Sequence, residues 1–186
     1  VLFADAKKAH LNGPTGEDIA FVDLPPELAK EGMCARLNFW LYGMRPAARA
    51  WEEEYASKLK GVGYVQGKSA PTVFTHGEKE IEGVVHGDDF TFMGPSRDLA
   101  RMRGLMEEWN QIKVRAILGD GPEDDREITL LNRIVRWRAD FVEVQADAKH
   151  QRLILECFGL DASSNPLASP SVKVDVDRAG DGELEK

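Results

Sequence analysis

Apolar residues along the chain gather in short runs of strand type that are separated by turn residues. Such runs occupy residues 1–6, 72–75, 81–85, 90–93 and 112–118. Runs of four to seven residues of this type, bounded by Gly, Pro or Asp, are typical of strands. The short distance between neighbouring runs favours hairpins over long crossover connections.

Two longer stretches have the spacing of helices. Between Pro46 and Lys60, Trp51, Tyr55 and Leu59 recur at every fourth position, and Gly61 follows. Because proline is favoured at the first position of a helix and glycine after the last one, this stretch predicts a helix with those three residues in the core. A second helix is predicted to begin at Ser96, a good N-cap, with an apolar face made of Leu99, Met102, Met106 and Trp109.

The later part of the chain predicts a hairpin and a third helix. Residues 128–137 and 141–144 alternate between apolar and polar around Ala139-Asp140. Asp147 is expected to cap a helix that Gly159 ends. The core face of this helix is expected to comprise Leu153, Ile154, Cys157 and Phe158.

Together these elements favour an α+β fold, an antiparallel sheet with helices packed on one face. The strand that ends at Asp5 and the hairpin that carries Asp88 and Asp89 are then expected in the same sheet. If the two are neighbours, three carboxylates converge from distant parts of the sequence.

The acidic residues are unevenly distributed. The net charge of the 186 residues is −8, which argues against a nucleic-acid partner. However, residues 120–127 carry a net charge of −4 and residues 175–186 carry −3, so the remainder of the chain carries only −1. Both acidic stretches are predicted to be solvated, which leaves room for a basic face elsewhere.

Length and composition favour one domain with an extension. Residues 1–160 are expected to form the domain, and residues 161–186, rich in Ser, Pro, Asp and Gly, are expected to be a linker or a disordered acidic tail. The sequence starts inside a strand-like run without Met, which suggests a piece of a longer polypeptide. Cys34 and Cys157 stand in apolar context and predict no disulfide framework, which favours an intracellular location, cytoplasmic or nuclear. No apolar run approaches the ~20 residues of a membrane span.

The pair Asp88-Asp89 lies between two apolar runs and has two interpretations. Gly87 and the two aspartates suit a hairpin turn, since they tolerate unusual backbone angles and bond their own backbone. Paired carboxylates at a strand end can also hold divalent cations for phosphoryl chemistry. The pair by itself does not decide between the two.

Three segments follow one another along the chain: ADAKKAHLNG at residues 4–13, LYGMRPAARAW at 41–51 and VHGDD at 85–89. In this order they resemble the reverse transcriptase of copia-type retrotransposons. The family has Asp-x-x-x-Ala-Phe-Leu-Asn-Gly, then Leu-Tyr-Gly-Leu-Lys-Gln-Ala-Pro-Arg-x-Trp, then Tyr-x-Asp-Asp. Residues 128–134 occupy the place of its Leu-Gly-Ile strand, and residues 149–160 and 166–173 resemble the segments that lead toward the ribonuclease H portion. The resemblance extends over residues 1–173.

This resemblance implies a polymerase palm with a ferredoxin-like or RRM-like core. Asp5, Asp88 and Asp89 would then be the catalytic carboxylates that bind two Mg²⁺ (or Mn²⁺) ions, because Mg²⁺ prefers oxygen ligands. The implied partners are an RNA template, a DNA primer, deoxynucleoside triphosphates and the remainder of a pol polyprotein with its fingers, thumb and ribonuclease H; no membrane partner is expected.

The resemblance also suggests substrate contacts, each with a simpler alternative. His10 stands where the family places an aromatic residue that excludes ribose 2′-hydroxyls, but it could be a histidine at a strand edge. Arg45 and Arg49 could meet phosphates or be exposed helix-end cations. Lys7 and Lys8 could contact primer or template or be merely solvated.

Several departures from the family pattern leave two functions open. Pro46 replaces a Gln that touches the nucleotide, Ala48 replaces a Pro, and His86-Gly87 replaces Tyr-x; His86 is not expected to be catalytic. The resemblance implies a fingers region before Asp5 and a thumb after the palm, and residues 1–186 are expected to lack the first and to contain only part of the second. The chain is therefore expected to be either a palm fragment that is inactive without its fingers, or a decayed or repurposed non-catalytic module that binds a protein or nucleic acid.

Overall fold

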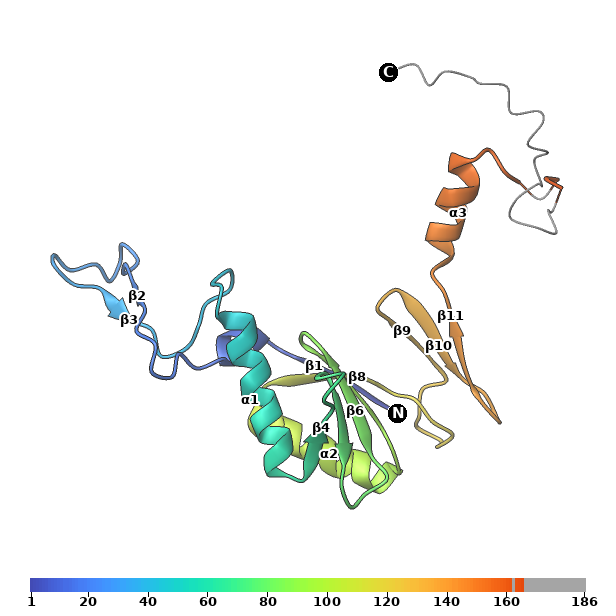
Figure 1. Cartoon of the computed structure of the whole chain (residues 1–186), viewed down its shortest axis with the longest axis horizontal. Coiled ribbons are helices and arrows are strands. Elements are labelled where there is room, and N and C mark those ends of the chain that lie inside the picture. The colour runs from blue at the N-terminus through green and yellow to red at the C-terminus, as the bar shows by residue number, and fades with distance from the viewer. Residues whose placement is uncertain (162, 166–186) are drawn as a thin grey trace, which may run out of the picture. The chain divides into compact units, whose positions relative to one another are not determined.

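An antiparallel sheet of six strands forms the centre of the fold (Figure 1). The structure is a computed structural model that describes residues 1–161 and 163–165. The strand order is β4-β5-β6-β7-β1-β8. The strands are β1 (Leu2–Ala6), β4 (Tyr64–Gln66), β5 (Val73–His76), β6 (Glu82–His86), β7 (Asp89–Met93) and β8 (Ile112–Ile117).

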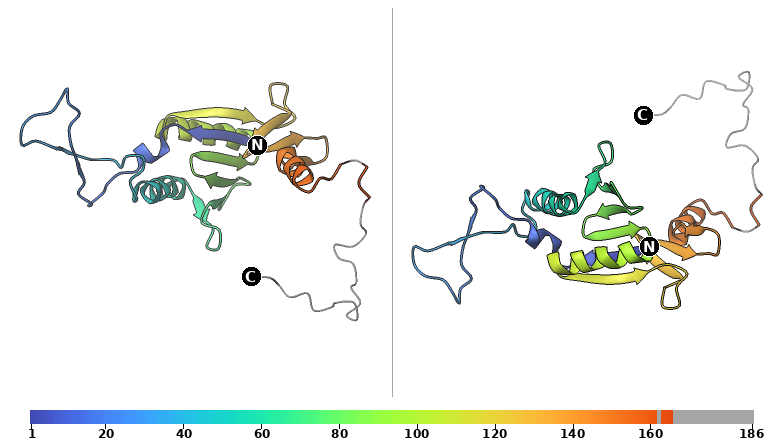
Figure 2. Two further views of the ribbon diagram at one scale, coloured as in Figure 1. Left: turned by 90° about the horizontal axis from the view of Figure 1, so that it is seen from above. Right: turned by 90° about the horizontal axis from the view of Figure 1, so that it is seen from below.

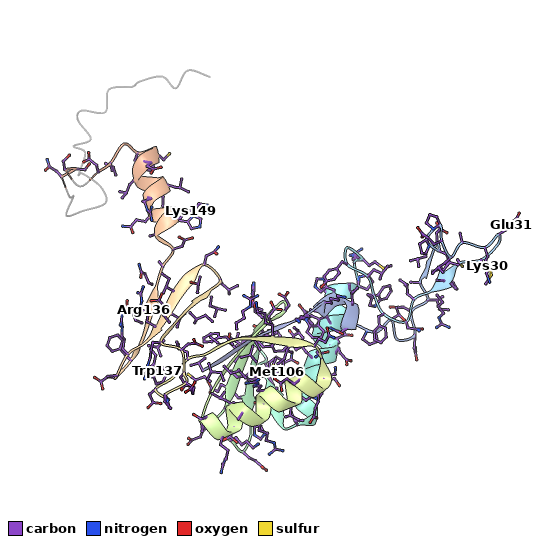
Figure 3. All side chains as sticks on the ribbon, turned by 180° about the vertical axis from the view of Figure 1, so that it is seen from behind. Lys30, Glu31, Met106, Arg136, Trp137 and Lys149 are labelled. Atoms are coloured by element: carbon purple, nitrogen blue, oxygen red, sulfur yellow. The ribbon has the colours of Figure 1, made fainter. Side chains whose placement is uncertain are left out.

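Two helices, α1 (Ala47–Gly61) and α2 (Ser96–Trp109), cover one face of this sheet. Trp51, Tyr55 and Leu59 of α1 are buried as their spacing predicts, and Met106 of α2, labelled in Figure 3, belongs to the same core. Along β1, alternate residues point to opposite faces. The core therefore receives Leu2, Ala4 and Ala6, whereas Phe3 and Asp5 lie on the opposite face, which we call the helix-free face.

Between β1 and α1 the chain has little regular structure. It forms a short 3-10 helix, η1 (Ala9–Asn12), and then a two-stranded ribbon of β2 (Phe21–Val22) and β3 (Ala35–Arg36). Lys30 and Glu31 lie at the tip of the loop between these strands (Figure 3). Large apolar side chains of this stretch are exposed to solvent, namely those of Ile19, Phe21, Leu28, Met33, Phe39, Leu41 and Tyr42.

A second sheet has three antiparallel strands in the order β11-β10-β9. These are β9 (Glu127–Leu130), β10 (Arg133–Trp137) and β11 (Val142–Gln145). Its apolar residues pack with Val1, Phe3, Ala116 and Leu118, and both views of Figure 2 show the chain start, marked N, beside this sheet.

One prediction for this region was wrong, because residues 128–137 do not form a single strand. Leu131 and Asn132 both have positive φ, 46° and 60°, and form the two-residue turn between β9 and β10. Positive φ at both turn residues is the pattern of a type I′ hairpin, which matches the twist of its strands. Leucine rarely adopts this conformation, so the sequence pattern hid the turn.

The chain divides into two compact units, residues 1–145 and residues 146–186. The second unit contains α3 (Ala148–Cys157), which Asp147 caps as predicted by accepting a hydrogen bond from the backbone N–H of Lys149 at 2.8 Å. The apolar face predicted for this helix is not buried: Leu153, Ile154, Cys157 and Phe158 are all exposed. The expected domain boundary at residue 160 stays a prediction, and most of the expected tail, residue 162 and residues 166–186, lies outside the described residues.

The described residues form helices and mostly antiparallel sheet, which agrees with the α+β prediction. Cys34 and Cys157 are both free, as expected, but they are exposed rather than embedded among apolar residues. No helix of the described residues is long and apolar enough to span a membrane.

Gly83 on β6 provides a test of the packing between sheet and helices. A Cβ at this position would overlap the ring of Phe92, which is fully buried in the neighbouring strand. We expect Gly83→Ala to lower the free energy of unfolding by about 1–3 kcal/mol, because a well-packed core cannot accept an added methyl group without moving. The measurement is equilibrium unfolding in urea.

Gly104 is the matched control. It lies inside α2, and a Cβ there would have no heavy atom within 4 Å. Gly104→Ala is therefore expected to raise the stability by roughly 0.5–1 kcal/mol, since alanine is the better helix former. Equal effects of the two substitutions would contradict the packing described for β6.

Candidate functional site

The pairing of β1 with β7 brings Asp5 and Asp89 together. The two residues are direct partners across the antiparallel pair. Side chains of directly opposite residues lie on the same face with Cβ atoms about 4.5–5.5 Å apart. Both carboxyl groups therefore stand side by side on the helix-free face, Asp5 from β1 and Asp89 from the start of β7, and their side chains are only 21% and 16% exposed.

Asp88 lies in the tight turn between β6 and β7. His86 and Asp89 pair with one another, so the turn consists of Gly87 and Asp88 alone. Gly87 has a φ of +65°, whereas Asp88 has a negative φ, which is the pattern of a type II′ hairpin with glycine at its first central position. Both interpretations of the Asp pair thus apply at one location: Asp88 belongs to the turn, and Asp89, the first residue of β7, lies opposite Asp5.

Two hydrogen bonds fix this turn to its surroundings. The backbone N–H of Ala6 donates to the carbonyl of Asp88 at 2.8 Å, which extends the pairing with β1 past Asp5. The indole Nε1–H of Trp51, a buried residue of α1, donates to the carbonyl of Gly87 at 2.9 Å. The turn is therefore held by both the sheet and the helix layer beneath it.

Arg115 of β8 joins the two carboxylates. Its Nη2 atom lies 2.5 Å from Asp5 Oδ2 and 3.2 Å from Asp89 Oδ1. The hydrogen bond to Asp5 is the main cause that raises the pKa of Arg115. The contact to Asp89 has the distance of an ion pair but not the geometry of a hydrogen bond, and the buried Oδ1 atom of Asp89 has no hydrogen-bond donor among the described residues.

Burial raises the pKa of Asp89 above its ordinary value of 3.8. The nearby carboxylates of Asp88 and Asp5 raise it further, whereas Arg115 and His86 act in the opposite direction. Desolvation is the largest of these effects, so ionised Asp89 is less favourable in the folded chain than in water.

The donor set has the chemistry that a hard cation requires, namely carboxylate oxygens, one of them buried without a donor. In the described part of the chain, no group of three or more His, Cys, Asp or Glu side chains is arranged to hold a metal ion. Asp88 is exposed in its turn, while Asp5 and Asp89 contact Arg115. Two of the three predicted carboxylates therefore meet directly, and their nearest cation is a guanidinium.

His10 lies in η1, close to an aromatic residue that the sequence did not single out. Its ring centroid is 5.1 Å from that of Tyr42, at an angle of 49°. Lys8, at the start of η1, has a positive φ of 55°, and the Asn12 side chain donates to the carbonyls of Lys7 and Lys8. Lys7 and Lys8 are both exposed, and substrate contacts by these residues stay a prediction.

Arg45 and Arg49 are exposed near the beginning of α1. The Arg49 side chain is 83% exposed and pairs with Glu53, one helical turn later, at 2.7 Å. Such an exposed pair has the geometry of an ordinary surface ion pair. A phosphate contact by either arginine stays a prediction.

Arg115 is the main site residue that the sequence did not reveal. It belongs to a run, Ile112–Leu118, that predicts nothing more than a strand. Its partners are 110 and 26 positions away, so no local pattern connects them. The available signal was a pair of cations, Lys113 and Arg115, in an otherwise apolar strand, because such charges need a partner if they are not fully solvated.

The chain is similar to the retrovirus-related Pol polyprotein from transposon TNT 1-94 of Nicotiana tabacum, with 27% identity over 177 residues. The similarity covers 89% of this chain but only 12% of the length of that polyprotein. No family model matches the chain, and no solved structure matches it. This distant similarity supports an origin in a copia-type retrotransposon pol sequence.

Trp51→Phe tests the support beneath the turn. The substitution leaves an aromatic ring in the core but removes the donor to the Gly87 carbonyl. We expect a loss of about 1–3 kcal/mol in the free energy of unfolding, since a partly buried acceptor loses its partner. Trp109→Phe is the control, because Trp109 packs against the same core and its indole makes no hydrogen bond among the described residues. Equal losses in urea unfolding would contradict a role for this hydrogen bond.

The raised pKa of Asp89 predicts a pH dependence of stability. The folded chain holds the Asp89 proton more tightly than the unfolded chain, so this contribution to stability is present at low pH and is lost as the pH rises through the folded pKa. Asp89→Asn cannot ionise. Its stability relative to the parent should therefore increase as the pH rises from below 3.8 toward neutrality, measured by urea unfolding at each pH. A difference that stays constant would show that Asp89 ionises as it does in the unfolded chain.

Proposed function

We propose that this chain is the palm fragment of an RNA-directed DNA polymerase from a copia-type retrotransposon. The observation that carries the proposal is the direct pairing of Asp5 with Asp89, next to the turn that contains Asp88. The aspartates of the first and third motifs, which follow the order of the family along the sequence, thus lie next to one another in the fold. The similarity to a Pol polyprotein supports the same origin.

The proposed role of the three carboxylates is to bind two Mg²⁺ or Mn²⁺ ions. Asp5 and Asp89 would contribute from neighbouring central strands, which hold their backbones rigidly. Asp88 would contribute from a turn that the Trp51 and Ala6 hydrogen bonds fix. When bound, the ions would lower the pKa of a primer 3′-hydroxyl and neutralise the triphosphate and leaving pyrophosphate.

The remaining residues of the proposal bind and orient the substrates. His10 and Tyr42, whose rings contact one another, would adjoin the sugar of the incoming nucleotide. The exposed Lys7, Lys8 and Arg45 would contact phosphates of the primer and template, as would Arg49 after release from Glu53. The rest of the polyprotein would supply fingers and thumb, because positioning accounts for much of the acceleration in phosphoryl transfer.

A second candidate function is a non-catalytic module that derives from the same pol sequence. Two observations favour it. Arg115 already forms ion pairs with Asp5 and Asp89, and the stretch between η1 and α1 exposes several large apolar side chains, among them Phe21, Leu28 and Met33. Clustered exposed apolar residues mark surfaces that bind other proteins.

Primer extension tests the proposed activity. We expect no extension by residues 1–186 alone, and extension in Mg²⁺ when a fingers segment from the same polyprotein is fused before Val1. Because loss of one catalytic group can remove nearly all acceleration, Asp5→Asn or Asp89→Asn in the fusion should lower the rate at least ~100-fold. Glu107→Gln on the surface of α2 is the control and should leave the rate unchanged.

Each other outcome of this experiment has a defined meaning. Extension by the isolated chain would show that the nucleotide site lies within residues 1–186. A folded fusion that is silent would implicate Pro46, which Pro46→Gln tests. If this substitution also gives no extension, the non-catalytic function replaces the polymerase proposal.

A further inference from the structure

Arg115 lies at a β-bulge of β8. β8 pairs with β1 through Phe3 and Ala116, but the next pair is Ala4 with Val114. Arg115 therefore has no partner of its own, and both Arg115 and Ala116 oppose Phe3. A bulge of this kind inserts one extra residue into a strand and re-aims its side chains, and bulges are over-represented next to active sites.

Arg115 lies on the helix-free face. Ile112, Val114 and Ile117 of β8 pack against the core beneath the helices, while Ala116 packs with Phe3 on the helix-free face. Because Ile112 and Val114 belong to the core, the alternation of the strand places Arg115 on the opposite face, and the bulge lets Ala116 follow on that face before Ile117 returns to the core. Arg115 therefore shares the helix-free face with Asp5, where its side chain is 40% exposed.

The guanidinium of Arg115 contacts both carboxyl groups. One nitrogen, Nη2, contacts Asp5 Oδ2 and Asp89 Oδ1 at the same time. Directly opposed carboxylates repel one another, and a positive charge near them relieves this repulsion. Arg115 supplies that charge from within the chain, and a divalent ion that binds the same two oxygens would be repelled by the guanidinium.

We propose that Arg115 is an internal counter-ion that competes with divalent cations for Asp5 and Asp89, so that metal binding requires the guanidinium to leave. The inference rests on the proposed function, since it concerns the same carboxylates. Partial exposure allows Arg115 to turn into solvent, where it keeps its charge. The chain would thereby keep Arg115 bound to its carboxylate pair until a divalent cation displaces it.

Direct titration with Mn²⁺ tests this competition. The full chain is titrated, and free Mn²⁺ is measured by its electron paramagnetic resonance signal. If Arg115 leaves the carboxylates free for about one-tenth of the time, Arg115→Gln should bind Mn²⁺ about tenfold more tightly than the parent. Adding Asp89→Asn to Arg115→Gln should abolish this gain. Arg103→Gln is the matched control. It removes a partly exposed arginine that pairs with Glu107, and it should leave the Mn²⁺ affinity unchanged.

A second measurement needs no substitution. In the parent chain labelled with ¹⁵N-arginine, the side-chain N–H signal of Arg115 should move during a Mg²⁺ titration, with the same midpoint as binding. The signal of Arg103 should not move. This measurement decides the question even if Arg115→Gln fails to fold, because it follows the departure of the guanidinium directly.

The possible failures are distinguishable. Equal Mn²⁺ affinity in the parent and Arg115→Gln would overturn the competition but keep the proposed metal site. Weaker binding by Arg115→Gln would show that Arg115 positions the carboxylates rather than blocking them, and would also overturn the inference. No binding by either folded protein at millimolar Mn²⁺ would overturn both the inference and the metal site of the proposed polymerase.

Discussion

The antiparallel pairing of β1 with β7 is the contact on which the rest of the site depends. It places the first strand of the chain in the interior of the sheet, between a hairpin strand and β8. One face of β1 supplies small and apolar residues to the core, and the other carries Asp5 opposite Asp89. A shift of this pairing by one residue would turn Asp5 toward the core, which is why burial fixes the register so strongly. The same contact therefore builds the core and aligns the carboxylates.

Arg115 makes the carboxylate pair tolerable within a folded chain. Two partly buried acids side by side would destabilise the sheet unless a positive charge lies near them. Arg115 brings that charge from β8 on the helix-free face, without burying it in the core. A cation that binds at this location has to overcome the positive charge of Arg115. This choice separates the proposed polymerase from the non-catalytic alternative.

Burial is unequal along the chain. The six-stranded sheet and its two helices enclose large side chains such as Trp51 and Phe92 almost completely. By contrast, the stretch around β2 and β3 exposes Phe21 and Met33, and α3, in its own unit, exposes Phe158. The apolar periodicity of α3 was correct as a helix signal, yet periodicity cannot show whether a face has a partner. In each of these segments, large apolar side chains thus remain exposed to solvent within their own unit.

The sequence by itself determined the elements whose signals are local. Trp51, Tyr55 and Leu59 predicted α1 and its buried face. Ser96 indicated the start of α2, although it is the first helical residue and not the predicted N-cap, which is Pro95. The predominance of hairpins also predicted that Asp5 and the Asp pair share one sheet. Tertiary structure alone decided that Asp89 rather than Asp88 faces Asp5 and that Arg115 contacts both of the paired carboxylates. The turn at Leu131-Asn132 escaped prediction for a local reason, because leucine rarely adopts a positive φ. Turns and helix faces depend on residues a few positions apart, whereas the pairing of β1 with β7 and the ion pairs of Arg115 join residues 26 to 110 positions apart, whose relative alignment is set by packing of the whole sheet.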